Sequence, residues 1–178
     1  MGYGIKLGGG GGVLSNGVIL KDFNASGYPQ TLVFSLKYPI PNMCFYFDGN
    51  YMPWFPILYR YLTNITITAP SIGSSAFKKY AQSVQSDKLK LKLKTSLIDS
   101  NAFSSFLSNS STSASNNKIW ISSKCATINS DAFYNFNSNA GAAIYCETAS
   151  KPSGWNANWN YSNYAVYYGI SEASFDAL

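Results

Sequence analysis

The chain contains no histidine among its 178 residues. Histidine is the commonest general base, the commonest metal ligand and the base partner in Ser–His and Cys–His pairs. The sequence also lacks a Gly-x-Ser-x-Gly nucleophile motif and a Cys-x-x-Cys metal spacing. These absences predict that the protein is not an enzyme and that it binds neither a cofactor nor a metal ion.

Charged residues are also scarce, at 12% of the chain, about half of the usual share of roughly 25%. The net charge of +5 comes from a shortage of acids, with 13 basic and 8 acidic residues, and it does not predict nucleic-acid binding. Hydrophobic residues make up 46% and aromatic residues 16%, which excludes a disordered chain. The composition predicts one domain whose surface is polar through Ser, Asn, Thr and Tyr, as is common outside a cytoplasm.

Cysteine occurs only three times, as Cys44, Cys125 and Cys146. The odd number leaves at least one thiol unpaired. Cys44 lies between Met43 and Phe45, so we expect it to be buried. For Cys125 and Cys146, a disulfide and two free thiols both remain open. No segment reaches the roughly 18 apolar residues of a membrane span or shows a secretory signal, so we expect no membrane insertion and no export signal.

An internal repeat of the form Ile-x-x-x-small-Phe organises the chain. Full copies lie at residues 72–77, 98–103 and 128–133, and a degenerate copy lies at 40–45. Each follows a short stretch of alternating apolar residues, at 32–34, 65–67, 91–93 and 119–121. Alternation predicts a strand with one buried face, and one strand-turn unit cannot close a core alone. The repeat therefore predicts a solenoid of stacked units.

The repeat resembles the BspA-type leucine-rich repeat, whose typical unit contains Ile-Gly-x-x-Ala-Phe. Residues 68–77 are the closest copy, and the segment 144–160, with its two tryptophans, is similar to the end of such arrays. The resemblance implies a β-rich α/β solenoid, an irregular leucine-rich-repeat array with parallel strands and no catalytic residues. It further implies a role in adhesion or assembly, because the family occurs in bacterial surface proteins and in phage-encoded proteins.

Three regions follow from this organisation. Residues 1–27 are expected to form an extended glycine-rich arm, residues 28–170 the repeat domain with an aromatic C-terminal cap, and residues 171–178 a tail. In the repeat domain we expect a buried core of Ile72, Phe77, Ile98, Phe103, Ile128 and Phe133.

The glycine-rich arm is predicted to attach the chain to a larger assembly. Five consecutive glycines lose much entropy on ordering, so such a segment is ordered only where partner contacts offset that cost. Deleting residues 1–27 should then leave the repeat domain folded. The attachment residues are Gly8, Gly9, Gly10, Gly11, Gly12, Val13 and Leu14.

Two surfaces are candidates for a ligand or a partner. The segment 88–94 alternates Lys and Leu, which predicts a strand with a row of outward lysines, here called the lysine strip: Lys88, Lys90, Lys92 and Lys94. The strip is either a solvated face or a site for an anionic polymer such as an acidic glycan. The second candidate is the aromatic cluster near the end of the repeats, which either caps the last unit or stacks on sugar rings: Trp155, Trp159, Tyr161 and Tyr164.

The function that fits these features is a non-enzymatic structural or host-recognition component of a phage virion, attached by its N-terminal arm. The expected partners are other structural proteins of an assembly, sister copies in a homo-oligomer, and a host-surface glycan or protein, with no nucleic acid. The alternative is a bacterial surface adhesin or a glycan-binding repeat module, located on the bacterial cell surface instead of the virion.

Overall fold

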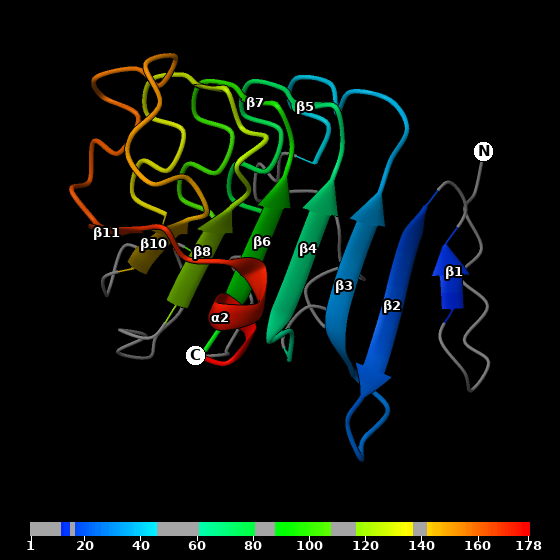
Figure 1. Cartoon of the computed structure of the whole chain (residues 1–178). Coiled ribbons are helices and arrows are strands. Elements are labelled where there is room, and N and C mark those ends of the chain that lie inside the picture. The colour runs from blue at the N-terminus through cyan, green and yellow to red at the C-terminus, as the bar shows by residue number, and fades with distance from the viewer. Residues whose placement is uncertain (1–11, 15–16, 46–60, 81–87, 108–116, 137–141) are drawn as a thin grey trace.

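The computed structural model describes residues 12–14, 17–45, 61–80, 88–107, 117–136 and 142–178. In these residues the chain forms a β-solenoid with stacked parallel strands and almost no helix (Figure 1). The solenoid makes about three full parallel turns, one for each strand of its smaller sheet.

A long sheet forms one wall of the solenoid. Its described strands run in the order β1-β2-β3-β4-β6-β8-β10-β11. Their bounds are β1 Gly12–Leu14, β2 Val18–Phe23, β3 Pro29–Ser35, β4 Asn64–Thr68, β6 Lys90–Lys94, β8 Asn117–Ile121, β10 Ala142–Cys146 and β11 Ala165–Tyr168. The small sheet pairs the two-residue strands β5 (Ser71–Ile72), β7 (Leu97–Ile98) and β9 (Thr127–Ile128).

The strands from β3 to β11 pair in parallel and in register, so equivalent side chains stack in rows along the solenoid. One inward row contains only aliphatic side chains, from Leu32 through Ile65, Leu91 and Ile119 to Ile144, and these five are at most 1% exposed. Because the side-chain period of a strand is two, the neighbouring residues form rows on the outer face.

The repeat core is confirmed. Each predicted isoleucine and phenylalanine of the three full copies is completely buried. The ring of Phe103 is stacked between those of Phe77 and Phe133, at centroid distances of 5.3 and 5.7 Å. The degenerate copy joins the same column, because Phe45 stacks on Phe77 at 4.9 Å. Each turn thus supplies one ring of a continuous column.

Backbone N–H groups in the turns alternate between two kinds of partner. After β5, the N–H groups of Ser75, Phe77 and Lys79 donate to carbonyls of the next turn at 3.0, 2.8 and 3.1 Å. The intervening N–H groups of Ala76 and Lys78 donate to carbonyls three residues back in their own turn, both at 3.2 Å. This alternation pairs the backbone donors without forming a helix.

The alternation depends on residues with positive φ at two fixed places in each turn. Ser75, Asn101 and Asp131 have φ of 55°, 57° and 57°, and Lys79, Ser105 and Asn135 have φ of 58°, 54° and 50°. This conformation costs an L residue roughly 1–2 kcal/mol and interrupts a right-handed helix. The helical share implied by an α/β class is therefore wrong for the described turns.

The predicted boundary between arm and domain at residue 28 is also wrong. Strand β2 pairs antiparallel with β3 over five residue pairs, and Leu20 is only 4% exposed. Residues 18–23 therefore belong to the sheet, and deleting residues 1–27 would expose core side chains. The segment lacks the Ile-x-x-x-small-Phe repeat, because an antiparallel end strand adds no turn to the stack. Of the attachment residues, Gly12, Val13 and Leu14 form β1, while Gly8–Gly11 lie outside the described residues.

All three cysteines are free, so the disulfide alternative is excluded. Cys125 and Cys146 are buried, and burial raises the pKa of each thiol to about 12, which keeps both protonated at neutral pH. Cys44 is exposed, contrary to expectation. It occupies the small-residue position of the first, degenerate copy, at the end of the phenylalanine column.

Replacing Phe103 tests the phenylalanine column. Phe103→Ala removes the ring between two stacked neighbours, and we expect a loss of about 3–5 kcal/mol of unfolding free energy from reduced burial and a cavity. Denaturant unfolding monitored by circular dichroism measures this. Tyr38→Ala is the control, because Tyr38 is 79% exposed and should change stability by roughly 0.5 kcal/mol or less. A loss below about 1 kcal/mol for Phe103→Ala would contradict the column's role.

Two adjacent lysines test the left-handed positions. Lys79 has φ of 58°, whereas Lys78 lies outside the positive-φ region. Lys79→Gly should stabilise the protein by roughly 0.5 kcal/mol, because the released strain of roughly 1–2 kcal/mol exceeds the added entropy of the unfolded chain. Lys78→Gly should destabilise it by about 0.4–1 kcal/mol. Equal losses for the two variants in thermal unfolding would show that Lys79 carries no strain.

Candidate functional site: the outer sheet face and its C-terminal strap

The lysine strip lies on the outer face of the sheet, as the alternation predicts. Leu89, Leu91 and Leu93 point into the core and are at most 1% exposed. Lys90 and Lys92 lie on the opposite face of β6, in register with Lys118 and Trp120 of the neighbouring strand β8. Trp120 is in turn aligned with Tyr145 of β10, and Tyr145 with Tyr167 of β11. The four strands β6, β8, β10 and β11 thus form a surface that is both basic and aromatic.

The C-terminal residues 170–178 cross this surface and are here called the C-terminal strap. The chain leaves β11, turns at Gly169 with φ of 75°, and forms the short helix α2 (Glu172–Asp176). The side chain of Ser171 caps the helix by accepting a hydrogen bond from the N–H of Ser174. In Figure 1, α2 lies in front of β6 and β8. The expectation of a tail at 171–178 is therefore wrong: these residues are packed on the sheet.

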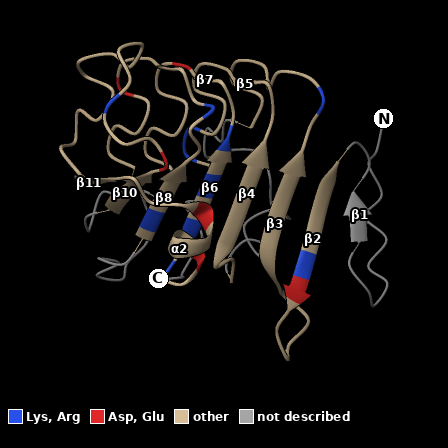
Figure 2. Ribbon diagram, viewed as in Figure 1, with Lys and Arg blue, Asp and Glu red and all other residues tan. Residues whose placement is uncertain are grey.

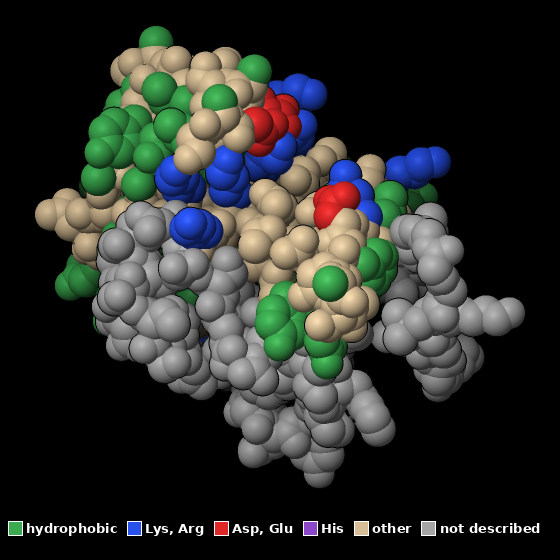
Figure 3. Space-filling view, turned by 90° about the horizontal axis from the view of Figure 1, so that it is seen from below, with side chains coloured by type: hydrophobic (Ala, Val, Ile, Leu, Met, Phe, Trp, Pro, Cys, Tyr) green, Lys and Arg blue, Asp and Glu red, His purple; other side chains and the backbone are tan. Residues whose placement is uncertain are grey.

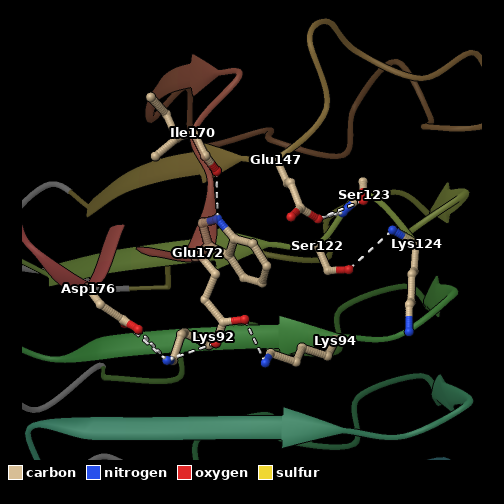
Figure 4. A network of polar contacts seen from close by, with 10 residues as sticks. Lys92, Lys94, Ser122, Ser123, Lys124, Glu147, Ile170, Glu172 and Asp176 are labelled. Atoms are coloured by element: carbon tan, nitrogen blue, oxygen red, sulfur yellow. Dashed lines mark hydrogen bonds and ion pairs between the residues drawn. The ribbon is translucent and has the colours of Figure 1, made fainter. Parts of the chain in front are cut away.

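Acidic residues of the strap lie over the lysine-bearing strand β6, as the coloured ribbon shows (Figure 2). Lys92 Nζ lies 3.0 Å from both Glu172 Oε1 and Asp176 Oδ1. Lys94 Nζ lies 2.7 Å from Glu172 Oε2. The carboxylate of Glu172 therefore bridges two lysines, as Figure 4 shows. In the space-filling view, the visible acidic side chains also lie against basic ones (Figure 3).

These charges change the acidity of the paired groups. Partial burial alone would raise the pKa of Glu172, but hydrogen bonds and charge from Lys94 and Lys92 outweigh it and lower the pKa. For Lys92, burial alone would lower the pKa, and the hydrogen bonds to Asp176 and Glu172 raise it instead. Both partners are thus held in their charged forms at neutral pH.

Backbone oxygens of the strap accept further hydrogen bonds from the sheet. Lys90 Nζ donates to the carbonyl of Asp176, and Lys118 Nζ donates to the backbone oxygen of Leu178, each at 2.8 Å. The indole N–H of Trp120 donates to the carbonyl of Ile170, also at 2.8 Å. Side chains of the sheet therefore bind the backbone of the strap as well as its carboxylates.

One strap side chain is fully buried. Phe175 is 0% exposed, and its ring lies 5.5 Å from that of Tyr145 and 5.8 Å from Lys90 Nζ. Burying a phenylalanine contributes about 1.5–3 kcal/mol. Each partly exposed ion pair adds only roughly 0.2–1 kcal/mol after solvent screening. A few kcal/mol therefore hold the strap, and Phe175 contributes the largest share.

The lysine strip is thus not an open site for an anionic polymer. Three of its members, Lys90, Lys92 and Lys94, are occupied by the strap, while Lys88 precedes the strand and is exposed. Sequence reasoning missed this because the strap's acids are separated from the strip by more than 70 residues. The signal was present in the pattern Glu172-x-x-Phe175-Asp176, whose apolar and acidic members match the sheet face.

The predicted aromatic cluster divides into a cap and an exposed part. Trp155 and Trp159 are 3% and 5% exposed, so they form the cap and are not a ligand surface. Trp155 takes the place of the repeat isoleucine by bridging to Ile128, and Trp159 packs edge-on against Phe133. Tyr164 is half-buried against the core.

Tyr161 remains on the surface, at 63% exposure, beside Tyr134, at 44%. Their ring centroids are 5.7 Å apart, at 61° to one another. Sequence reasoning missed Tyr134, although its place directly after the buried Phe133 puts it on the outside of the turn. This tyrosine pair is the second candidate surface.

The described residues offer neither a metal site nor a membrane helix. No group of three or more Cys, Asp or Glu side chains in the described ranges is arranged to hold a metal ion. No helix in this part of the chain has the length and hydropathy needed to cross a membrane.

Comparison with known proteins returned no family model, no curated protein and no solved structure that matches the chain.

Acid should weaken the attachment of the strap to the sheet. Because the folded pKa of Glu172 lies below its ordinary value of 4.5, its ion pairs stabilise the strap above that value and are lost as the pH falls through the folded pKa. Glu172 faces Lys92 and Lys94, and its negative charge also acts on Glu147, where it opposes the lowering of that residue's pKa by Ser123. The NMR signal of the Trp120 indole N–H, bonded to Ile170, should shift as the strap loosens.

The indole of Trp155 is an internal control, because it donates to the carbonyl of Cys125 inside the core, at 2.9 Å, and should not shift in that range. Glu172→Gln should loosen the strap at neutral pH and remove this part of the pH dependence. A Trp120 signal that stayed constant until Trp155 also moved would show that the strap is not held by these charges.

Proposed function

We propose that the chain is a non-enzymatic BspA-type leucine-rich-repeat module that recognises a host surface as a structural component of a phage virion. The observation that carries this proposal is the exposed tyrosine pair, Tyr134 and Tyr161, on a rigid stack of turns.

The assignment to the BspA type rests on the roles of the repeated residues. In each full copy the isoleucine, the alanine and the phenylalanine are completely buried, and the isoleucines and phenylalanines stack on the equivalent residues of the next turn. The motif that resembles this family is therefore the motif that builds the solenoid, and this supports the proposed family.

The tyrosine pair suits recognition of a glycan. Tyr134 and Tyr161 lie on adjacent turns, with their rings in contact. Each comes shortly after a buried ring in the chain: Tyr134 directly follows Phe133, and Tyr161 comes two residues after Trp159, which packs against Phe133. An aromatic face packs against the C–H groups of a sugar, while its hydroxyl forms hydrogen bonds. The rigid backing lowers the entropy lost on binding.

The ends of the sheet support a division between attachment and recognition. Strand β1, with Gly12, Val13 and Leu14, is the first strand in the sheet order, whereas the tyrosine pair lies on the turns beside the last strands. We propose that the segment Gly8–Leu14 contacts other structural proteins at one end and that the tyrosines face the host at the other.

Mass spectrometry of purified particles tests the location, and a binding assay tests the surface. We expect the protein in intact virions and expect it to bind polysaccharide purified from the host surface. Tyr161→Ala and Tyr134→Ala should each weaken that binding about threefold to tenfold, consistent with roughly 0.5–1.5 kcal/mol for an aromatic contact.

Tyr38→Ala is the matched control, because Tyr38 is also exposed but lies on the first turn and should leave affinity unchanged. Absence from virions together with binding to bacterial surfaces would favour the alternative of a bacterial surface adhesin. New reducing ends released from the polysaccharide would overturn the non-enzymatic assignment.

A further inference from the structure

Within the described residues, one short connection at Gly169 joins the C-terminal strap to the sheet. It follows β11 by way of Gly169 and then contacts β6, β8 and β10, while its attachment strand is the last one in the sheet order. Within the described residues, α2 therefore packs on the solenoid without contributing a turn to it. Such an element can leave its site without disturbing the buried columns.

The site that receives the strap is specific for a peptide of this kind. Lys90, Lys118 and Trp120 donate to backbone oxygens of the strap, and Phe175 is completely buried. Lys92 and Lys94 pair with its carboxylates. An acidic polysaccharide can satisfy the lysines, but it has no side chain equivalent to Phe175 and no carbonyl in place of that of Ile170.

We propose that this site also receives the strap of a second copy, so that two chains pair by reciprocal exchange of residues 170–178. The second copy's strap makes the same contacts as the chain's own, since it has the same sequence. In dilute solution the chain's own strap occupies the site, because its short connection gives it an effective concentration in the millimolar range, far above the concentration of other copies. Where copies are crowded together, as in an assembly, binding of a second copy's strap competes with binding of the chain's own strap. The proposal does not depend on the proposed function.

Charge reversal in the full-length chain tests the exchange. A face variant carries Lys92→Glu and Lys94→Glu, and a strap variant carries Glu172→Lys and Asp176→Lys. Closure of each variant on itself is disfavoured, because like charges then meet between its strap and its sheet. When the two are mixed, both trans pairings are complementary, so native mass spectrometry should detect a one-to-one heterodimer. Each variant alone should remain a monomer.

The matched control carries all four substitutions in one chain, which restores complementary charges within the molecule. At the concentrations of the mixing experiment this chain should stay monomeric, and it should form no heterodimer with the face variant or with the strap variant. Circular dichroism and the Trp155 indole signal verify that each variant keeps its fold. A mixture that remains monomeric, while the four-substitution chain closes its strap, would overturn the proposal.

The unaltered chain gives a second readout that requires no change in the lysines. Its dimer fraction should rise as the concentration approaches about 1 mM, the effective concentration of a short tether. Phe175→Ala should abolish that rise. A wild-type chain that stays monomeric, or a Phe175→Ala chain that dimerises equally, contradicts the exchange. Release of the strap by polygalacturonate without any heterodimer in the mixture would assign the site to an acidic glycan instead.

Discussion

In-register stacking is the constraint on which the rest of the structure depends. No single turn of this solenoid encloses a core, so each turn must place the same kind of side chain above and below its neighbours. Phe103 illustrates the requirement, because its ring is parallel within 1° to that of Phe77 and within 8° to that of Phe133. The positive φ values at fixed places in each turn maintain the register, since they let alternate backbone N–H groups reach the next turn.

A stack of this kind leaves two open ends, and the chain closes each in a different way. At the start, β2 runs antiparallel to β3 and covers it with Leu20. At the end, Trp155 and Trp159 replace the repeat isoleucine and the small residue with larger apolar rings, which cover the last phenylalanine. Both solutions bury apolar surface that a further turn would otherwise cover.

The outer face of the sheet presents a different physical problem, because it combines lysines with aromatic rings that are costly to leave in water. The strap solves it by placing Phe175 on Tyr145 and carboxylates on Lys92 and Lys94. The ion pairs are partly exposed and contribute modestly, so the strap is the part of the described fold that solution conditions can most easily alter. The tyrosine pair lies on the turns of the solenoid and takes no part in these ion pairs.

The sequence by itself determined the solenoid and the burial of its repeated Ile and Phe residues, because the repeat and the alternation in residues 65–67 and 91–93 are local patterns with a direct geometric meaning. The parallel pairing of the strands was an implication of the family resemblance and did not follow from the alternation. It also placed the lysines of β6 on the outer face. Only the tertiary structure decided what covers those lysines, which tryptophans are buried, and that β2 belongs to the sheet. Each of these outcomes depends on contacts between residues far apart in the chain, such as Lys92 and Asp176, and side-chain periodicity carries no information about which distant segment will supply the partner.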